Sequence, residues 1–303
     1  MRTFHAGNRD ALFMGLMALA MAVWGGSWVC AKALGNGIHY QKLAFVRFTL
    51  TVLFFVPPII ALRESLRIRP ATAGLILLGS VLYTLYSQMF FLGLSLGTAG
   101  LGGVLVTSLV PIITYAGVSV LGRKKLRVID AAGLAIGCAG ALVILQIWRF
   151  SHEALLASGN LFFVIGAALW SGVTVNSQRT QSSVSIWVYS FYLNGFAALI
   201  RFLFVLPYGL DGLVSAEPSW WFSMTYLSLF STVGATSLYF YAAKKIGSRR
   251  ASAFTFMVPL TAVLLSWVVL GEVPAVSTIA GGLLSIGAVY LIQFGGAAET
   301  PGA

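Results

Sequence analysis

Residues 11–34 read ALFMGLMALAMAVWGGSWVCAKAL, an apolar stretch whose one charged residue is Lys32. It is longer than the roughly 20 apolar residues that cross a hydrocarbon core about 30 Å thick. We therefore expect a transmembrane helix here. The stretch contains Trp24-Gly25-Gly26-Ser27-Trp28, and 146 positions after Trp24 another apolar stretch carries Trp170-Ser171-Gly172-Val173-Thr174.

Other landmarks recur at nearly the same offset, which indicates a single duplication with small insertions in loops. The recurring pairs are Phe90-Phe91 with Phe240-Tyr241 (150 apart), Pro111 with Pro259 (148 apart) and Gly140-Ala141 with Gly287-Ala288 (147 apart).

Apolar residues make up 58% of the chain and charged residues only 9%, a balance that suits a lipid-facing surface. We expect an all-α membrane protein, because hydrocarbon cannot satisfy the backbone polar groups of irregular segments. Ten spans are predicted, at 11–34, 40–62, 72–94, 98–121, 127–147, 157–178, 184–207, 219–242, 251–271 and 275–294. The first is too long for the apolar part of a cleavable signal peptide, so we interpret it as a retained helix.

The net charge of +11 would suggest a nucleic-acid partner in a soluble protein, but here its distribution explains it. With a cytoplasmic N-terminus, the inner segments hold 14 of the 19 Lys and Arg residues, and the outer turns hold three. This bias predicts both termini in the cytoplasm of a multi-pass inner-membrane protein. We expect the lipid bilayer and a small-molecule substrate as partners, no nucleic acid, and a monomer or weak homo-oligomer.

The duplication divides the chain into two five-helix repeats. We predict a cytoplasmic N-terminus (1–10), a first repeat (11–147), a linker (148–156), a second repeat (157–294) and a cytoplasmic C-terminus (295–303). Because five is odd, the second copy enters the bilayer from the opposite side, which makes a 5+5 inverted repeat. Two such halves can expose a shared site to each side in turn, which favours a transporter over a receptor or an enzyme.

Acidic residues and histidines all lie at span ends or in loops. Ion-coupled carriers usually place a carboxylate at mid-membrane, and a hydrolase would need paired carboxylates, a metal cluster or a Ser/His dyad. We therefore expect no catalytic residue, metal or cofactor. Cys30 and Cys138 fall inside spans, where we interpret them as packing residues.

Aromatic and hydroxyl side chains are the groups that the spans could offer a ligand. Trp24, Ser27 and Trp28 share one helix face, and span 8 offers Thr232, Thr236 and Tyr239. Such groups can stack on a ligand and hydrogen-bond its polar atoms, although single rings are also common interface anchors. The predicted substrate-cavity residues are Trp24, Ser27, Tyr83, Tyr86, Gln88, Trp170, Thr174, Thr232 and Tyr239.

Two arginines and two prolines interrupt apolar spans. Arg47 is either an interior anion-binding charge or a residue that snorkels or caps backbone carbonyls, and Arg201 is interpreted as snorkelling. Pro111 and Pro259 each free a backbone carbonyl, and are candidates for gating bends or fixed kinks. Small residues predict close helix packing at Gly133, Gly137, Gly140, Gly281, Gly282 and Gly287.

The residues also resemble the drug/metabolite transporter superfamily, and within it the EamA-type ten-helix carriers, over about 11–294. The matching pieces are Trp24-Gly25 with Lys32, Phe45-Val46-Arg47-Phe48, Leu96-Gly97-Thr98-Ala99 followed by Pro111, Leu121-Gly122, Leu270-Gly271-Glu272 and the glycine pattern through Gly287. One departure is Arg123-Lys124 after span 4, where many relatives carry an acidic residue.

The resemblance implies the same topology and a central cavity lined by helices 1, 3, 4, 6, 8 and 9, with Arg47 in a more peripheral helix. It implies that the cavity is faced or adjoined by Trp24, Tyr83, Tyr86, Trp170, Thr174 and Tyr239. It does not name a substrate, because the family moves amino acids, nucleotide metabolites, sugars and drugs.

We expect a secondary transporter that moves a small metabolite such as an amino acid, outward, by alternating access. One alternative is a broad-specificity drug exporter, which the many rings would also suit. A second alternative is a membrane sensor or structural protein without transport.

Overall fold

The computed structural model describes residues 3–34, 38–96, 99–122, 126–149, 151, 153, 158–211, 217–270 and 276–294. Within these ranges every regular element is helical, which confirms the all-α prediction. The first half contains α1 (Thr3–Leu34), α2 (Tyr40–Ala61), α3 (Pro70–Leu96), α4 (Ala99–Gly122), α5 (Val128–Leu145) and the 3-10 turn η1 (Ile147–Arg149).

The second half contains three helices that are each a single α-helix and two helical runs that change type along their length. The single helices are α7 (Ser158–Thr180), α8 (Ile186–Val205), which leads into the 3-10 turn η2 (Leu206–Tyr208), and α13 (Val276–Phe294). One run joins α9 (Pro218–Thr225), the π-helix η3 (Tyr226–Thr236) and α10 (Ser237–Ile246). The other joins α11 (Ser248–Ala253), the 3-10 segment η4 (Phe254–Met257) and α12 (Val258–Leu270).

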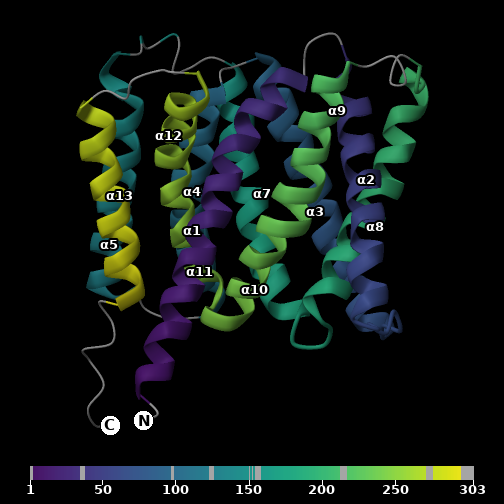
Figure 1. Cartoon of the computed structure of the whole chain (residues 1–303), viewed down its shortest axis with the longest axis horizontal. Helices are drawn as coiled ribbons and strands as arrows, with labels where there is room; N and C mark the ends of the chain where they lie inside the picture. The colour runs from purple at the N-terminus through teal and green to yellow at the C-terminus, as the bar shows by residue number, and fades with distance from the viewer. Residues whose placement is uncertain are drawn as a thin grey trace.

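Each predicted span coincides with one of these helices or helical runs to within a few residues, except at the start of α1. This helix begins at Thr3, and its polar first turns extend beyond the rest of the bundle (Figure 1). Among the described residues, seven helices are long and apolar enough to cross a membrane, and α5 supplies a shorter apolar helix over Val128–Ile144.

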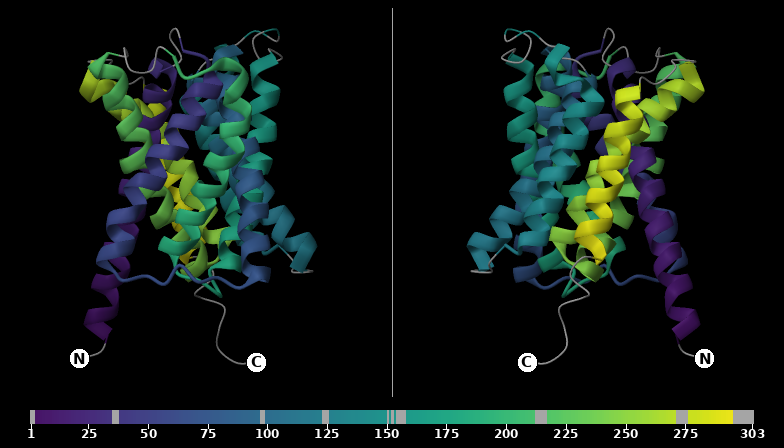
Figure 2. Two further views of the ribbon diagram at one scale, coloured as in Figure 1. Left: turned by 90° about the vertical axis from the view of Figure 1, so that its right-hand side faces the viewer. Right: turned by 90° about the vertical axis from the view of Figure 1, so that its left-hand side faces the viewer.

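The helices stand side by side, and α1 begins at the same end of the bundle at which α13 ends (Figures 1 and 2). Large apolar side chains such as Leu12, Ile60, Leu199 and Leu283 are exposed on the outside. So much exposed apolar surface would be unfavourable in water, but it is favourable in contact with lipid tails.

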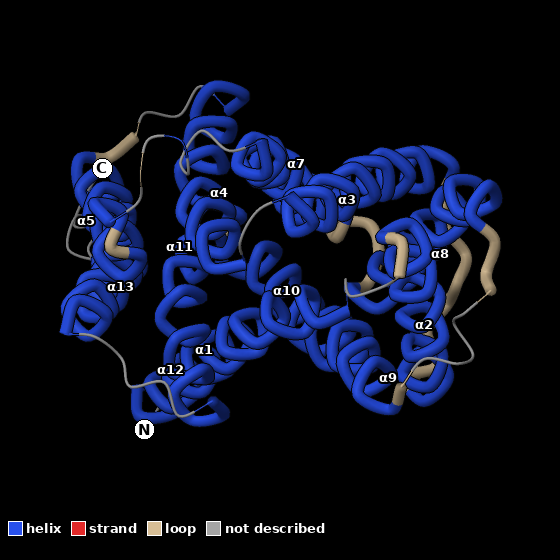
Figure 3. The backbone as a smooth tube through the Cα atoms, turned by 90° about the horizontal axis from the view of Figure 1, so that it is seen from above, coloured by secondary structure: helices blue, strands red, loops and turns tan. Residues whose placement is uncertain are grey.

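The most extensive helix contacts all join the first half of the chain to the second. Helix α5 packs on α13, α2 on α8, α3 and α4 on α7, and α1 on both η3 and α12. Figure 3 shows α5 and α13 as a pair at one edge of the bundle. Each helix has a counterpart at the same position in the other half. If every helix is replaced by its counterpart, the same set of helix pairs is obtained. The two halves therefore form one structural unit rather than two separate domains.

Small residues bring α5 and α13 into direct backbone contact. A Cβ atom on Gly140 would lie 2.7 Å from the carbonyl oxygen of Gly281, and one on Gly281 would lie 2.5 Å from that of Gly140. Gly133, Gly137 and Gly282 also lie against neighbouring side chains. The prediction was wrong for Gly287, because among the described residues no atom outside the local helix backbone lies within 4 Å of a Cβ placed there.

Candidate functional site

A small cavity of about 50 Å³ lies inside the bundle, with walls contributed by both halves of the chain. Its first-half residues come from α1, α2, α3 and α4, and its second-half residues from α7, η3, η4 and α12. The lining residues are Trp24, Ser27, Trp28, Arg47, Tyr83, Tyr86, Phe90, Val106, Thr107, Val110, Trp170, Leu227, Ser231, Thr236, Thr255 and Val258.

Trp170 lies at the centre of the aromatic wall. Its ring centroid is 5.3 Å from that of Trp24 in an edge-to-face arrangement, 4.8 Å from Tyr86 and 5.6 Å from Tyr83. Aromatic pairs prefer such offset and edge-to-face geometries. Because Trp24 and Trp170 are the landmarks of the duplication, the two copies of one sequence feature meet at the cavity.

Five of the nine predicted cavity residues line the cavity, and the other four lie elsewhere. Trp24, Ser27, Tyr83, Tyr86 and Trp170 line the cavity. Thr174 and Tyr239 lie behind the rings, where their hydroxyl oxygens are 3.1 Å apart and the Tyr239 ring packs 4.9 Å from Trp24. Thr232 is buried against Arg47 rather than in the wall.

Gln88 is placed elsewhere, which corrects its assignment to the cavity. Its side-chain amide donates to the Tyr40 hydroxyl at 3.1 Å, and its amide oxygen accepts from Arg201. Gln88 therefore belongs to a polar cluster between α2, α3 and α8. The sequence predicts which residues share a helix face, but it does not predict which neighbouring helix that face contacts.

The π-helical segment η3 presents Leu227, Ser231 and Thr236 to the cavity. The hydroxyls of Thr232 and Thr236 donate to carbonyls five residues earlier, those of Leu227 and Ser231. Wide π turns shift the register of side chains and occur frequently at functional sites. Residues five apart share a face in a π turn, which agrees with Ser231 and Thr236 both lining the wall, whereas Thr232 contacts Arg47.

Both prolines follow a cavity-lining threonine by four residues, a signal that the sequence analysis missed. Pro111 has no N–H to donate to the carbonyl of Thr107, and Pro259 has none for that of Thr255. The Thr255 hydroxyl donates to the Thr107 carbonyl oxygen at 2.7 Å. The Thr255 carbonyl accepts instead from the Val258 N–H. The motif Thr-x-x-x-Pro, present in each half, thus twice places beside the cavity a carbonyl whose usual helical donor is replaced by another.

Arg47 lies at the cavity, although the resemblance placed it in a peripheral helix. Only 7% of the residue is exposed, so it does not snorkel to the surface. Its Nη2 donates to the Thr232 hydroxyl at 3.3 Å, while its Nε has no hydrogen-bond partner among the described atoms. Of the alternatives left open by the sequence, the geometry matches an interior charge.

Arg201 is also buried, so the expectation that it snorkels was wrong. It is 1% exposed and donates through Nη1 to Gln41 and Gln88 and through Nη2 to the Thr84 carbonyl. These acceptors come from two other helices, α2 and α3. Arg201 therefore joins three helices and does not line the cavity.

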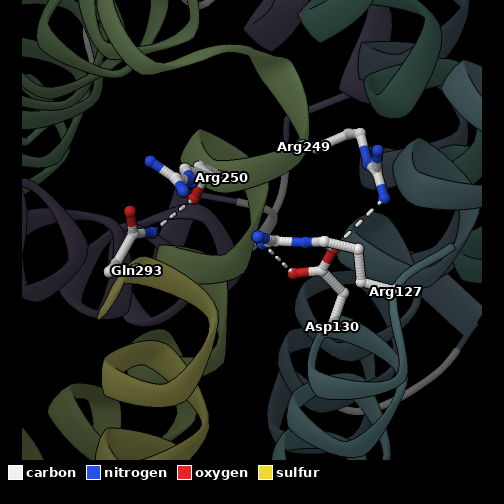
Figure 4. A network of polar contacts seen from close by, with 5 residues as sticks. All are labelled: Arg127, Asp130, Arg249, Arg250 and Gln293. Carbon is white, nitrogen blue, oxygen red and sulfur yellow. Dashed lines mark hydrogen bonds and ion pairs between the residues drawn. The ribbon is translucent and has the colours of Figure 1, made fainter. Parts of the chain in front are cut away.

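A charged network joins the two halves at the end of the bundle that holds the start of α1. Asp130 accepts from Arg127 through both carboxylate oxygens, at 2.8 and 2.9 Å, and its Oδ2 lies 3.4 Å from Nη2 of Arg249 (Figure 4). Nearby, Gln293 donates to the Arg250 carbonyl at 2.8 Å. The network links α5 to α11 and α13.

Several predicted residues lie outside the described part of the chain, including Gly97, Thr98, Arg123, Lys124 and Glu272. Among the residues that are described, no group of three or more His, Cys, Asp or Glu side chains is placed to hold a metal ion.

The exposed apolar helices define a multi-pass membrane protein, and an aromatic cavity lies between its halves. The family model of the EamA-like transporter family matches residues 12–146 and, a second time, residues 157–294. The chain belongs to this family of transporters, within the drug/metabolite transporter superfamily, as its motifs predicted.

Individual relatives agree with this assignment. An uncharacterized transporter of Archaeoglobus fulgidus is 25% identical over 91% of this chain and 95% of that protein. The uncharacterized transporter YvbV of Bacillus subtilis is 26% identical over 92% of this chain and 90% of that protein. One crystal structure superposes with a TM-score of 0.74 at 20% identity, over 92% of this chain and 96% of that chain, which shows a shared fold.

Proposed function

We propose that this protein is a secondary transporter of the cytoplasmic membrane that moves a small metabolite, such as an amino acid, outward by alternating access. In this proposal ten segments cross the bilayer, five in residues 11–147 and five in 157–294. The runs Pro218–Ile246 and Ser248–Leu270 supply the eighth and ninth. Both termini lie in the cytoplasm, on the side that carries most of the Lys and Arg residues.

The observation that carries the proposal is the cavity lined by both halves. Trp24 and Thr107 in the first half contact Trp170 and Thr255, their counterparts at offsets of 146 and 148, and all four residues line the same cavity. The pairing of helices between halves is likewise unchanged by exchanging the halves. Inverted repeats arranged in this way can open a shared site to either side by rocking against each other.

The residues that line the cavity also indicate whether transport is coupled to a proton or a sodium ion. No Asp or Glu is found among the described residues that surround the cavity. A proton relay or sodium site usually employs such a carboxylate. We therefore propose exchange or facilitated diffusion rather than tight proton coupling.

Counterflow in proteoliposomes tests this function. Solutes are first selected by their ability to raise the melting temperature of the purified protein, since a ligand stabilises the state that it binds. Liposomes loaded with an unlabelled stabilising solute should then accumulate the labelled solute, with or without a pH gradient. Stabilising solutes that give no counterflow would refute transport, whereas uptake abolished by collapsing the gradient would refute exchange without proton coupling.

Tryptophan variants connect transport to the cavity. Trp24→Ala and Trp170→Ala each remove a ring from the wall and should reduce counterflow at least about tenfold, because positioning errors are costly in a packed site. Trp148→Ala removes an exposed tryptophan outside the cavity and should leave counterflow unchanged. If the double variant Trp24→Ala/Trp170→Ala inserts correctly and transports normally, the two rings do not contribute to ligand binding.

The outward direction needs a separate measurement in cells. Cells that contain the gene should retain less of the stabilising solute after loading than cells that lack it. Greater retention would indicate import instead.

A further inference from the structure

Arg47 is a buried cation with unused donor capacity. Its guanidinium has five N–H donors, yet the described contacts satisfy it with one hydrogen bond of 3.3 Å to Thr232, and Nε has none. Removing a charge from water without a counter-charge is unfavourable. A guanidinium in this state has a strong preference for an anion.

Arg201 provides an internal comparison, because it is also a buried arginine in the same bundle. Its Nη1 and Nη2 donate to three oxygens that the fold supplies from α2 and α3, although its Nε, like that of Arg47, has no partner among the described atoms. Because these acceptors already bind both terminal nitrogens of Arg201, we expect no ligand to bind this side chain. Arg47 has no such set of acceptors, and it lies in the cavity wall.

The other residues of the cavity wall determine which chemical groups the anion should have besides its negative charge. Six rings from Trp24, Trp28, Tyr83, Tyr86, Phe90 and Trp170 supply flat apolar surface. The Ser231 hydroxyl can donate to or accept from a polar atom, whereas the Thr236 hydroxyl already donates to the Ser231 carbonyl and accepts from Nε1 of Trp24 at 3.3 Å. No carboxylate in the described wall can receive an ammonium group, and Arg47 would repel one.

We propose that the cavity binds a small organic carboxylate with an aromatic or otherwise apolar body, and that Arg47 receives the carboxylate. This inference rests on the proposed transport function and names the substrate class of that same cavity. The rings enclose the apolar body of the solute. Cationic aromatic compounds are excluded as good ligands by the same charge.

Three matched probes test the charge requirement on the purified wild-type protein. The probes are 3-phenylpropionate, its neutral isostere 3-phenylpropanamide and the cation 3-phenylpropylamine, with binding measured by calorimetry at pH 8. The carboxylate should bind at least about tenfold more tightly than the other two, because charge-assisted bonds to a desolvated guanidinium are strong. Equal or tighter binding of the amide or the amine would overturn the proposal.

Variants assign the preference to Arg47. Arg47→Gln should abolish the preference for the carboxylate over the amide. Arg47→Lys should retain part of it, because an ammonium keeps the charge but loses the bidentate geometry. The matched control Arg201→Lys changes a buried arginine outside the wall and should retain the full preference. If Arg47→Gln does not fold, Arg47→Lys and the wild-type probe series still decide the question, and a preference unchanged in Arg47→Lys would contradict the assignment.

Flux measurements separate this inference from the proposed function. Carboxylate-selective binding without counterflow of labelled 3-phenylpropionate, relative to protein-free liposomes, would support the cavity chemistry and refute transport. Counterflow of 3-phenylpropylamine but not of 3-phenylpropionate would support transport and overturn the carboxylate site.

Discussion

The Thr255 hydroxyl donates to the backbone carbonyl of Thr107 at a distance of 2.7 Å, and that carbonyl is the one that Pro111 leaves without an amide donor. The bond crosses from η4 in the second half to α4 in the first, beside the cavity. The Thr255 hydroxyl also lies 2.8 Å from the Ser252 carbonyl in its own helix. Proline in one half thus creates an acceptor that a threonine in the other half satisfies.

The variant Thr255→Val should lower the stability of the protein. It leaves the buried Thr107 carbonyl without its donor, at a cost of about 1–3 kcal/mol. Thr255→Ser keeps the hydroxyl and should be less affected. Thr107→Val is the matched control in the other half, because the Thr107 hydroxyl donates within its own helix, to Gly103, and its loss should matter little. Melting temperatures in detergent measure the difference, and equal losses for the two Val variants would show that the bond between halves contributes nothing.

Glycine substitutions test the α5–α13 contact. Gly140→Ala places a Cβ 2.7 Å from the Gly281 carbonyl oxygen, so the two helices must separate. We expect a loss of about 1–3 kcal/mol, as is usual for overpacking a close contact. Gly287→Ala lies on α13 with open space around it, and should be neutral or slightly stabilising because alanine favours a helix. Thermal unfolding of both variants gives the comparison, and no loss for Gly140→Ala would contradict the packing described.

Asp130 should be coupled more strongly to Arg127 than to Arg249. Arg127 makes two short hydrogen bonds to the carboxylate, whereas Arg249 makes one longer contact (Figure 4). The Arg249 guanidinium also lies 4.5 Å from the centroid of the Tyr115 ring. Double-mutant cycles with Asp130→Asn, Arg127→Gln and Arg249→Gln measure both couplings. We expect about 1–2 kcal/mol for the Arg127 pair and about 0.5 kcal/mol for Arg249. The reverse order would be inconsistent with this geometry.

Stability should depend on pH through His39, the N-cap of α2. Its Nδ1 accepts the Gln41 backbone N–H at 3.3 Å, and its ring stacks on Tyr208 with centroids 3.9 Å apart. Partial burial lowers the pKa of this imidazole, and the nearby Lys42 ammonium lowers it further. The unfolded chain therefore binds the proton first as the pH falls, so folding should weaken below about pH 6.5, the ordinary histidine value.

His39→Asn is the control for this titration, because asparagine is also a good N-cap and does not ionise. Melting temperatures between pH 8 and 5.5 should fall more for the wild type than for His39→Asn. Parallel profiles would show that His39 does not contribute to the pH dependence.

Local sequence features predicted much of the helical architecture. Long apolar stretches can only be helical in lipid, and a helix such as Tyr40–Ala61 begins and ends where its composition changes. The π-helix at Tyr226–Thr236 was not predicted, because the hydropathy of a sequence does not distinguish a π-helix from an α-helix. Its register brings Ser231 and Thr236, which are five residues apart, onto one face toward the cavity.

The sequence by itself determined the all-helical class, the duplication and the family, because apolar length and recurrent motifs are properties of the chain alone. Only the tertiary structure distinguished Arg47 from Arg201, two arginines in equally apolar stretches. One lines the cavity with most of its donors unused, and the other binds oxygens 160 and 117 residues away in α2 and α3. The neighbours of a buried charge come from distant helices, so their identity is fixed by packing and not by local sequence.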